Sequence, residues 1–427
     1  MILFAVFIVL LAGYEMVSLI EWKREGRPLL ERLALSYLIG AGAVTLLMFA
    51  LALLKIKFNI WLICLPWLIL SPLCFTSKVK LPRLPKLSVG EGLITCALGL
   101  KLFYVFYEAL IKPVTGWDAL WNFSFRAKVF FFERGIPLDR SHPYFLGGGM
   151  RQYPPHLPLL EAWTYISQGA WNDAAMKIIF PLYFLALLIV FYYCLRREKS
   201  RRQSLFFTFL LSSLPLLTYH AAMEYADFIV GGYFLAAVVY LYQFIKENDS
   251  RILMLSAVLA ALGPWVKDEG QIFFFICLLV LMVARRFNWK YLLTYLSPYV
   301  ILIGPWIMFK NVFKLSLGNE PGFSLARFGS YFNFHPEIIP KMLQDVFLKG
   351  NWHLLFILWL LVLMFFGRKI FKSEVKYIFW TSALAWLFFT AIYVFTFNWG
   401  MVFTGIIVHR NFLTFVPQIL LLCGLTL

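Results

Sequence analysis

Charged residues are scarce in this chain. Only 14% of its 427 residues are charged, whereas 61% are hydrophobic and 19% are aromatic. A typical soluble domain is about 25% charged and about 45–50% apolar, and even a large core could not hide so much apolar surface from water. The composition therefore excludes a water-soluble enzyme, a disordered chain and a disulfide-stapled secreted domain. It predicts a polytopic, all-α membrane protein.

Cysteine is also rare, and no long polar loop contains one. All six cysteines lie inside apolar runs, where cysteine behaves as a small hydrophobic residue, so we expect no disulfide framework and no metal cluster. The 39 Lys and Arg outnumber the 22 Asp and Glu. In a membrane protein this excess is typical of cytoplasmic loops. Without Cys–His metal spacing or a basic tail, the sequence gives no support to nucleic-acid binding.

Apolar runs suited to membrane-spanning helices occur about 13 times. The first lacks a basic start and a small-residue cleavage site, so we interpret it as a retained helix rather than a signal peptide. A span needs about 20 mostly apolar residues, and two of the runs are short. The expected spans are residues 2–20, 33–54, 58–76, 89–111, 174–195, 204–222, 228–245, 252–266, 271–284, 291–310, 353–367, 377–397 and 410–427.

Six basic clusters fall in every second loop between these spans. Because Lys and Arg collect in cytoplasmic loops, the alternation supports the helix count. It places all six clusters on the cytoplasmic side of a plasma membrane. The N-terminus and the two long loops, 113–173 and 311–352, are then expected outside, and the C-terminus inside. The clusters are Lys23/Arg24/Arg27, Lys78/Lys80/Arg83/Lys86, Arg196/Arg197/Lys199/Arg201/Arg202, Lys246/Arg251, Arg285/Arg286/Lys290 and Arg368/Lys369/Lys372/Lys376.

The first long outer loop contains a carboxylate shortly after the end of an expected transmembrane span. Asp118 stands between two tryptophans, which favour the membrane–water interface. A carboxylate in a half-buried aromatic setting can act as a general base. Asp118 could also be the N-cap of a helix over 119–134 that ends at Gly135, and the two roles can coexist.

The remainder of this loop combines interfacial helix with turning backbone. The 119–134 segment interleaves Phe and Trp with Arg126 and other charged residues, as an amphipathic interfacial helix does. Glycine and proline then dictate irregular backbone, including Gly147–Gly149, before a further amphipathic helix over 157–167. Two lone histidines, His142 and His156, are better explained as hydrogen-bonded surface groups than as metal ligands.

Two acidic turns are expected on the same face of the membrane. One contains Glu224 and Asp227, and the other contains Lys267, Asp268 and Glu269. Charges near membrane depth are costly unless they face a polar cavity. A solvated turn or a local Lys–acid pair would also fit these residues, but three charges between two short helices favour a cavity.

Arg410, next to His409, begins the last expected span at its outer end. A guanidinium group suits phosphate because it forms two parallel hydrogen bonds. The alternative is an interfacial anchor that extends to the lipid headgroups. Together with the acidic residues, Arg410 and Lys267 on one membrane face would fit an anionic lipid-linked donor.

Four stretches resemble the GT-C glycosyltransferases that use polyprenyl-phosphate sugars, such as protein O-mannosyltransferases and the bacterial aminoarabinose transferase. Gly116–Leu120 with Gly135-Ile136-Pro137 is similar to the family's first outer loop. The other three are similar to its Tyr-Pro-Pro segment, its Lys-x-Glu-Gly turn and the arginine motif that begins a late helix. They are Tyr153–Leu159, Lys267–Gly270 and His409–Pro417.

The resemblance covers residues 89–427 and leaves 1–88 as three extra N-terminal transmembrane helices. It implies a GT-C-like catalytic domain whose long first outer loop carries interfacial helices. Many relatives have a second acid beside the first in that loop. Here Trp117 and Ala119 flank Asp118, so we expect no metal ion or other cofactor.

The resemblance implies transfer of a sugar from a polyprenyl-phosphate donor to a protein, lipid or glycan acceptor, by one inverting displacement on the outer face. Asp118 would be the base, and Lys267 and Arg410 would face the phosphate. The residues implied to bind substrate besides these two are Glu224, Asp227, Asp268, Glu269, His409, Arg126 and Tyr153. A transporter or lipid flippase is the rival interpretation, and a structural subunit is a third, but transporters line a path near mid-helix.

Overall fold

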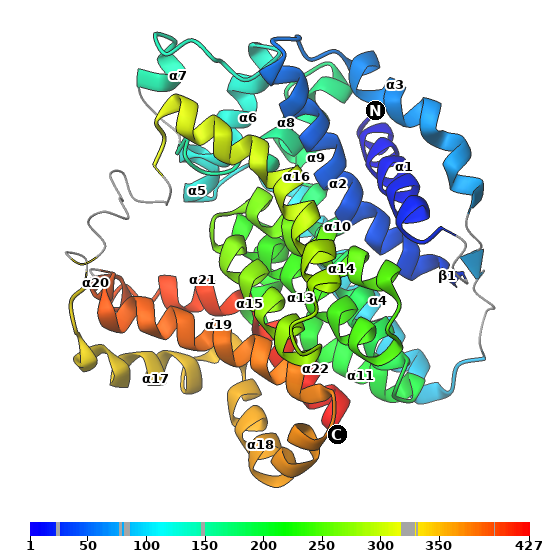
Figure 1. Cartoon of the computed structure of the whole chain (residues 1–427), viewed down its shortest axis with the longest axis vertical. Coiled ribbons are helices and arrows are strands. Elements are labelled where there is room, and N and C mark those ends of the chain that lie inside the picture. Colours follow the sequence, from blue (N-terminus) through cyan, green and yellow to red (C-terminus); the bar gives the residue numbers. More distant parts are fainter. Residues whose placement is uncertain are drawn as a thin grey trace.

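The computed structural model describes residues 1–22, 26–76, 79–80, 86–146, 150–316, 329, 332–396 and 398–427. These residues are overwhelmingly helical (Figure 1), and the one sheet among them is a parallel pair of two-residue strands, β1 (Arg27–Pro28) and β2 (Val79–Lys80). The helices are α1 (Ile2–Ile20), α2 (Leu29–Leu53), α3 (Ile60–Leu70), α4 (Val89–Ile111), α5 (Trp117–Trp121), α6 (Phe123–Phe132), α7 (Pro143–Leu146), α8 (His156–Gln168), α9 (Asp173–Met176), α10 (Ile179–Arg196), α11 (Arg201–Ser212), α12 (Pro215–Ala221), α13 (Ala226–Glu247), α14 (Ser250–Val266), α15 (Glu269–Ala284), α16 (Trp289–Phe313), α17 (Ile339–Phe347), α18 (Leu355–Lys372), α19 (Val375–Phe395), α20 (Trp399–Val402), α21 (Ile407–Leu413) and α22 (Val416–Thr426).

The expected polytopic membrane architecture is confirmed. In the described part of the chain, seven helical segments are long and apolar enough to cross a membrane, one of them formed by α9 and α10 together. Two bent helix pairs raise the number to nine if each is one span. The pairs are α11 with α12, bent by 74°, and α21 with α22, bent by 49°. Every expected span coincides with one or two helices, while the number 13 stays a prediction because several of these helices are short.

The hydrophobic α13 is the central helix of the bundle, and α10, α14 and α15 pack around it. The N-terminal helices are part of the same packing. A Cβ on Gly13 would stand 1.7 Å from the carbonyl oxygen of Ser36, and one on Gly40 would stand 1.8 Å from that of Val9. Helices α1 and α2 therefore cross with their backbones in contact, as small residues allow in membrane proteins.

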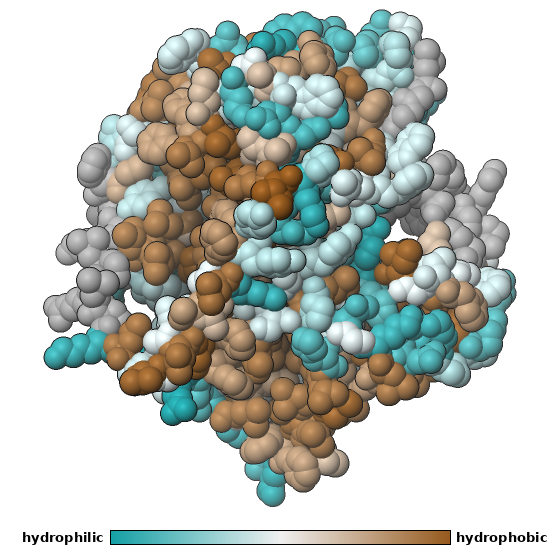
Figure 2. Space-filling model, turned by 180° about the vertical axis from the view of Figure 1, so that it is seen from behind, coloured by the Kyte–Doolittle hydropathy of each residue, from teal (hydrophilic) through white to brown (hydrophobic). Residues whose placement is uncertain are grey.

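Apolar side chains also cover much of the outer surface. Figure 2 shows hydrophobic residues spread over large areas of one face, with hydrophilic residues gathered between and beside them. On α4, Leu93, Leu100 and Phe103 are each about two-thirds exposed. A soluble protein rarely exposes so much apolar surface, but this surface suits contact with lipid chains.

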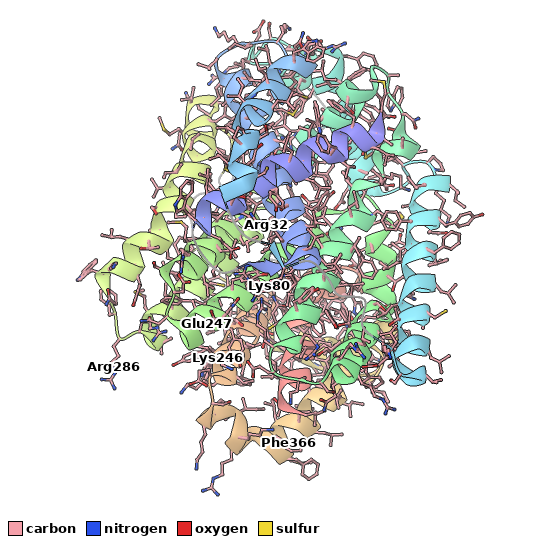
Figure 3. All side chains as sticks on the ribbon, turned by 90° about the vertical axis from the view of Figure 1, so that its right-hand side faces the viewer. Arg32, Lys80, Lys246, Glu247, Arg286 and Phe366 are labelled. Atoms are coloured by element: carbon pink, nitrogen blue, oxygen red, sulfur yellow. The ribbon has the colours of Figure 1, made fainter. Side chains whose placement is uncertain are left out.

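The basic clusters meet at the C-terminal end of α13. Arg285 donates to the carbonyl of Ile245 at 2.9 Å, and Arg251 donates to that of Trp22 at 3.1 Å. Figure 3 shows Lys80, Lys246 and Glu247 in this part of the molecule. That these clusters share one end of the molecule agrees with their occurrence in every second loop. Lys23, Arg24, Lys78 and Arg83 lie outside the described residues. Since α13 rises about 1.5 Å per residue, its two ends are roughly 30 Å apart.

The outer-loop prediction needs three corrections. The helix expected over 119–134 is two helices, α5 and α6, because the chain turns sharply at Asn122. The N-cap of α5 is Gly116, so Asp118 lies in the first turn and does not cap the helix. Helix α8 is buried almost all round rather than amphipathic at an interface, because α2 and α6 cover it.

His156 is correspondingly a core residue and not a surface group. It is fully buried, with Thr45 at 2.8 Å from Nδ1 and the Tyr183 hydroxyl at 2.9 Å from Nε2. Burial lowers the pKa of His156 to about 3, so this ring stays neutral. The Gly147–Gly149 stretch and residues 317–328, 330 and 331 of the 311–352 loop lie outside the described residues, and α17 forms within the described part of that loop.

Candidate active site

Five of the predicted site residues form one chain of ion pairs. Arg410 Nη2 lies 2.5 Å from Asp118 Oδ2 and 2.6 Å from Asp227 Oδ2. Lys267 Nζ lies 2.8 Å from Asp227 Oδ1 and 2.8 Å from Glu269 Oε1. We call Asp118, Asp227, Lys267, Glu269 and Arg410 the acidic cluster, since three carboxylates share two cations.

Four separate parts of the fold position this cluster. Asp118 comes from the first turn of α5, and Asp227 from the first turn of α13. Lys267 and Glu269 come from the tight turn between α14 and α15, and Arg410 comes from α21. Residues almost 300 positions apart in the sequence therefore meet at the N-terminal end of α13, opposite the basic clusters.

Burial decreases along the cluster from Asp227 towards Asp118. The Asp227 side chain is 2% exposed, that of Arg410 is 22% and that of Asp118 is 29%. Burial alone would lower the pKa of Lys267, but Asp227 and Glu269 beside it raise this pKa well above its ordinary value. The inner part of the cluster is thus buried and keeps Lys267 charged, whereas its outer part has an accessible carboxylate, Asp118.

A buried ion pair holds the backbone just ahead of Asp118. Lys177 Nζ lies 2.6 Å from Glu224 Oε1, and both side chains are fully buried. The same carboxylate accepts the backbone N–H of Gly116 at 3.3 Å, and Lys177 donates to the carbonyl of Pro113 at 3.2 Å. Glu224, predicted to bind substrate, is placed to hold the Asp118 turn.

The turn that carries Lys267 depends on a close contact between two helices. A Cβ on Gly270 would stand 2.1 Å from the carbonyl carbon of Gly263. The backbones of α14 and α15 therefore touch directly behind the turn. This contact explains why glycine follows the charged residues, since any side chain would push the turn out of place.

Two tyrosines lie beside the cluster, and a buried arginine holds the backbone of one of them. The Arg410 guanidinium stacks 4.9 Å from the centre of the Tyr225 ring. Tyr153 lies near Lys267, and burial raises the pKa of its hydroxyl. Arg126 is buried away from the cluster and donates to the carbonyls of Tyr153 at 3.0 Å and Met150 at 3.3 Å. Arg126 therefore holds the backbone at the start of the Tyr-Pro-Pro segment in place.

Two further predicted residues lie apart from the cluster. Asp268 turns towards α16, where Lys310 Nζ lies 3.0 Å from its Oδ1. Burial raises the pKa of Asp268 to about 6, against the opposing effect of Lys310. His409 is buried beside Trp352, and neither of its ring nitrogens has a hydrogen-bond partner in the described part of the chain.

Sequence reasoning missed Lys177, Lys310 and Tyr393. The two lysines are the buried partners of Glu224 and Asp268, and the Tyr393 hydroxyl accepts the side-chain amide of Asn411 at 2.5 Å, next to Arg410. A lone lysine within or at the end of an apolar run was the available signal, because a buried cation needs a nearby carboxylate. Tyr393 gave no such signal.

The carboxylates of the site face cations rather than one another. Among the described residues, no three His, Cys, Asp or Glu side chains are arranged to hold a metal ion. Asp118 can accept a proton, while Arg410 and Lys267 can bind an anion.

No protein-family model and no curated protein sequence matches this chain. A solved structure does match, the crystal structure of ArnT from Cupriavidus metallidurans bound to undecaprenyl phosphate. The TM-score is 0.58 at 12% sequence identity, over 78% of this chain and 60% of that one. The chain has an ArnT-like GT-C fold. The GT-C resemblance is thus confirmed as a fold, while this chain spans less than two thirds of the length of ArnT.

Proposed function

We propose that this protein is an integral membrane glycosyltransferase that moves a sugar from a polyprenyl-phosphate donor to an acceptor hydroxyl or amine. The observation that carries the proposal is Arg410, which joins an accessible carboxylate, Asp118, to a buried one, Asp227, within a GT-C fold. ArnT was crystallised with undecaprenyl phosphate, the kind of molecule that remains when a polyprenyl-phosphate sugar loses its sugar.

Arg410 is suited to receive the donor phosphate. It donates through Nε and Nη2, and its Nη1 donates to no residue that the structure describes. A guanidinium has five N–H donors, so a phosphate oxygen can bind at Nη1 while Asp227 keeps its contact. A second phosphate oxygen at Nη2 would replace Asp118. Donor binding would thus release the Asp118 carboxylate towards the acceptor.

The proposed reaction is a single displacement at the anomeric carbon. The acceptor oxygen or nitrogen attacks that carbon, and its proton passes to Asp118. The bond from the anomeric carbon to the phosphate oxygen breaks, and both bonding electrons leave with the polyprenyl phosphate. Arg410 and Lys267 stabilise the growing negative charge. The anomeric configuration inverts.

The remaining site residues have supporting roles in this proposal. Glu269, with a partly exposed side chain, is placed to accept hydrogen bonds from sugar hydroxyls, and Tyr153 is placed nearby. Asp227, the buried carboxylate, orients both Lys267 and Arg410 through its ion pairs. The positive-inside rule puts the basic clusters in the cytoplasm, so the acidic cluster would face the outside of a plasma (inner) membrane. The protein, lipid or glycan acceptor would approach from there.

Purified protein in detergent, supplied with a panel of radiolabelled polyprenyl-phosphate sugars and with membrane lipid extract as acceptor, tests the proposal. The readout is the release of free polyprenyl phosphate. We expect turnover by the wild type and a loss of about 10²–10⁴-fold in Asp118→Asn. Asp139→Asn is the matched control, since Asp139 is an exposed acid of the same loop, and it should keep full turnover.

Equal turnover in Asp118→Asn and the wild type would keep the transferase and remove Asp118 as its base. A wild type that neither turns over nor binds any donor of the panel would overturn the proposal. The proposed mechanism uses no metal ion, so turnover should survive EDTA. A loss on EDTA that Mg²⁺ or Mn²⁺ restores would contradict that part.

A further inference from the structure

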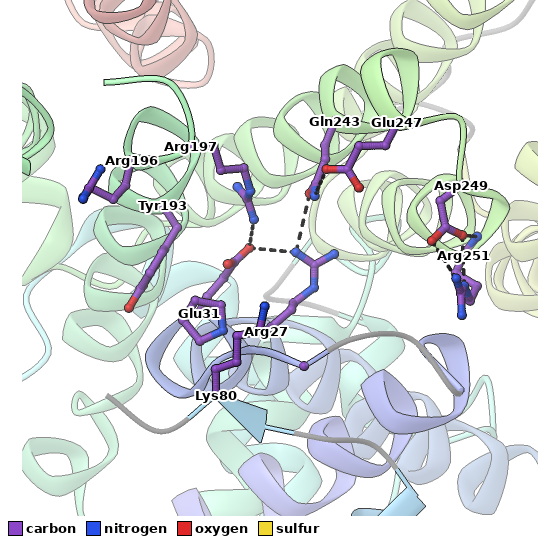
Figure 4. Close-up of a pocket in the computed structure, with 12 residues that line it drawn as sticks. Arg27, Glu31, Lys80, Tyr193, Arg196, Arg197, Gln243, Glu247, Asp249 and Arg251 are labelled. Atoms are coloured by element: carbon purple, nitrogen blue, oxygen red, sulfur yellow. Dashed lines mark hydrogen bonds and ion pairs between the residues drawn. The ribbon is translucent and has the colours of Figure 1, made fainter. Parts of the chain in front are cut away.

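A cavity of about 740 Å³ (Figure 4) lies at the C-terminal end of α13. The acidic cluster lies at the other end of this helix. Four separate stretches of the chain line it: the residues before and in the first turn of α2, strand β2, the end of α10, and the α13–α14 turn. The proposed transferase chemistry does not use this cavity. Its lining residues are Gly26, Arg27, Pro28, Glu31, Lys80, Tyr193, Arg196, Arg197, Gln243, Glu247, Asp249 and Arg251.

Positive charge is in excess in this cavity. Five of the lining side chains are Lys or Arg and three are Asp or Glu. The acids are already engaged within the protein. Glu31 pairs with Arg27 and Arg197, Asp249 pairs with Arg251, and Glu247 accepts the side-chain amide of Gln243 at 2.6 Å. The lining therefore carries two more positive than negative side chains.

Arg27 supplies an unsatisfied donor in this lining. The residue is only 3% exposed. Its Nε lies 2.5 Å from Glu21 and its Nη1 lies 2.9 Å from Glu31. Its Nη2 is buried and has no hydrogen-bond partner in the described residues. A buried guanidinium nitrogen without an acceptor is costly, and Figure 4 shows this guanidinium in the middle of the lining side chains, between Glu31 and Gln243.

Helix α2 adds a second preference for an anion. Its first turn lines the cavity, and no side chain caps its N-terminus. The first N–H groups of a helix point outwards and carry partial positive charge, which is why phosphate groups bind at such ends. The cavity has the size of a small-molecule site, so it has room for more than a single phosphate.

We propose that this cavity binds a phosphate-bearing anion, with Arg27, Lys80 and Arg196 as its cationic contacts. The phosphate can belong to a water-borne molecule or to a lipid headgroup of the adjoining leaflet. Both sources offer the oxygens that the Arg27 Nη2 and the first turn of α2 lack. The site is independent of sugar transfer, since it lies roughly 30 Å from Asp118 along α13.

Two binding measurements on the full-length protein separate the sources. Protein in phosphatidylcholine nanodiscs is titrated with inorganic pyrophosphate in magnesium-free buffer by calorimetry. Protein in nanodiscs with phosphatidylglycerol is analysed by native mass spectrometry for retained lipid. The test variant is Lys80→Gln with Arg196→Gln, two exposed side chains whose loss leaves the buried Arg27–Glu31 pair intact.

The matched control is Arg202→Gln with Lys290→Gln. These residues belong to the basic clusters, are exposed and do not line the cavity, so the net charge changes equally. We expect the cavity variant to bind about tenfold more weakly than the wild type, and the control to stay within about twofold. A loss with pyrophosphate identifies a water-borne ligand, and a loss with phosphatidylglycerol alone identifies a headgroup. If neither probe binds saturably, or if both variants weaken binding equally, the proposal is wrong.

Discussion

Two charge clusters lie at opposite ends of α13, and each is built around a buried carboxylate that two cations share. At the acidic cluster, Asp227 receives Lys267 and Arg410. At the basic end, Glu31 receives Arg27 and Arg197, and the Tyr240 hydroxyl donates to it at 2.7 Å. Both central carboxylates have side chains that are 2% exposed.

The clusters differ in what surrounds the central carboxylate. At the acidic cluster a second acid, Asp118, stands at the rim and is open to solvent. At the basic end the second acid, Glu21, is buried, with 3% of its side chain exposed. Lysine and arginine side chains line the cavity there. A similar buried core therefore lies next to an accessible carboxylate at one end and next to a cavity with excess positive charge at the other. The residues at the rim decide between the two.

The sharpest test of this comparison pairs Asp227→Asn with Glu31→Gln. Each neutralises the buried carboxylate that two cations share, so each should cost about 3–5 kcal/mol of stability. Only Asp227→Asn should also abolish turnover of the protein that remains folded. The checks are thermal unfolding in detergent and turnover per folded molecule. Equal turnover in the two variants would remove the functional distinction between the ends.

Arg410→Lys tests whether one guanidinium must bridge two carboxylates. Lysine keeps the charge but lacks the planar fork that contacts Asp118 and Asp227 together. We expect turnover to fall about 10–100-fold, with little change in unfolding temperature. Arg197→Lys, at the basic end, should leave turnover unchanged. A fully active Arg410→Lys protein would show that charge alone suffices at this position.

Gly270→Ala tests the backbone contact behind the Lys267 turn. The added methyl would overlap Gly263, and overpacking of this kind typically costs about 1–3 kcal/mol. We expect a lower unfolding temperature and weaker donor binding. Gly99→Ala is the control, because a Cβ there meets nothing within 4 Å. If both variants unfold like the wild type, the contact does not constrain the turn.

The last expected effect concerns the pH dependence of Asp268. Burial raises its pKa to about 6, above the value of about 3.9 in an unfolded chain. Its protonated form therefore favours the folded state below about pH 4, and this contribution is lost as pH rises through about 6. The stability of the wild type relative to Asp268→Asn should fall by roughly 2–3 kcal/mol between pH 4 and pH 7. A difference that is flat or that rises with pH would contradict the raised pKa.

Several local predictions followed directly from the sequence. The apolar runs place the helices because a membrane span needs length and hydrophobicity, and both can be read from the residues alone. The sequence also indicated that Asp118, Asp227, Lys267, Glu269 and Arg410 share one face, because each lies at the end of an apolar run on the same side of the alternation.

Other features lay beyond local reasoning. The break at Asn122 has no glycine or proline to announce it, and it arises where Arg126 contacts the Asn122 side chain at 3.4 Å. The burial of α8 and His156 depends on α2, which precedes them by more than a hundred residues. The pairings of Lys177 with Glu224 and of Lys310 with Asp268 join segments more than 40 residues apart, so no spacing within one segment predicts them.

The sequence by itself determined that this chain is a helical membrane protein, where its helices lie and which of their ends are basic or acidic, because hydrophobic length and charge are properties of each segment. Only the tertiary structure decided which acid meets which cation, which acid stays accessible, and that a cavity with an unsatisfied Arg27 opens at the basic end. Those properties depend on distances between segments far apart in the chain, which helix packing fixes.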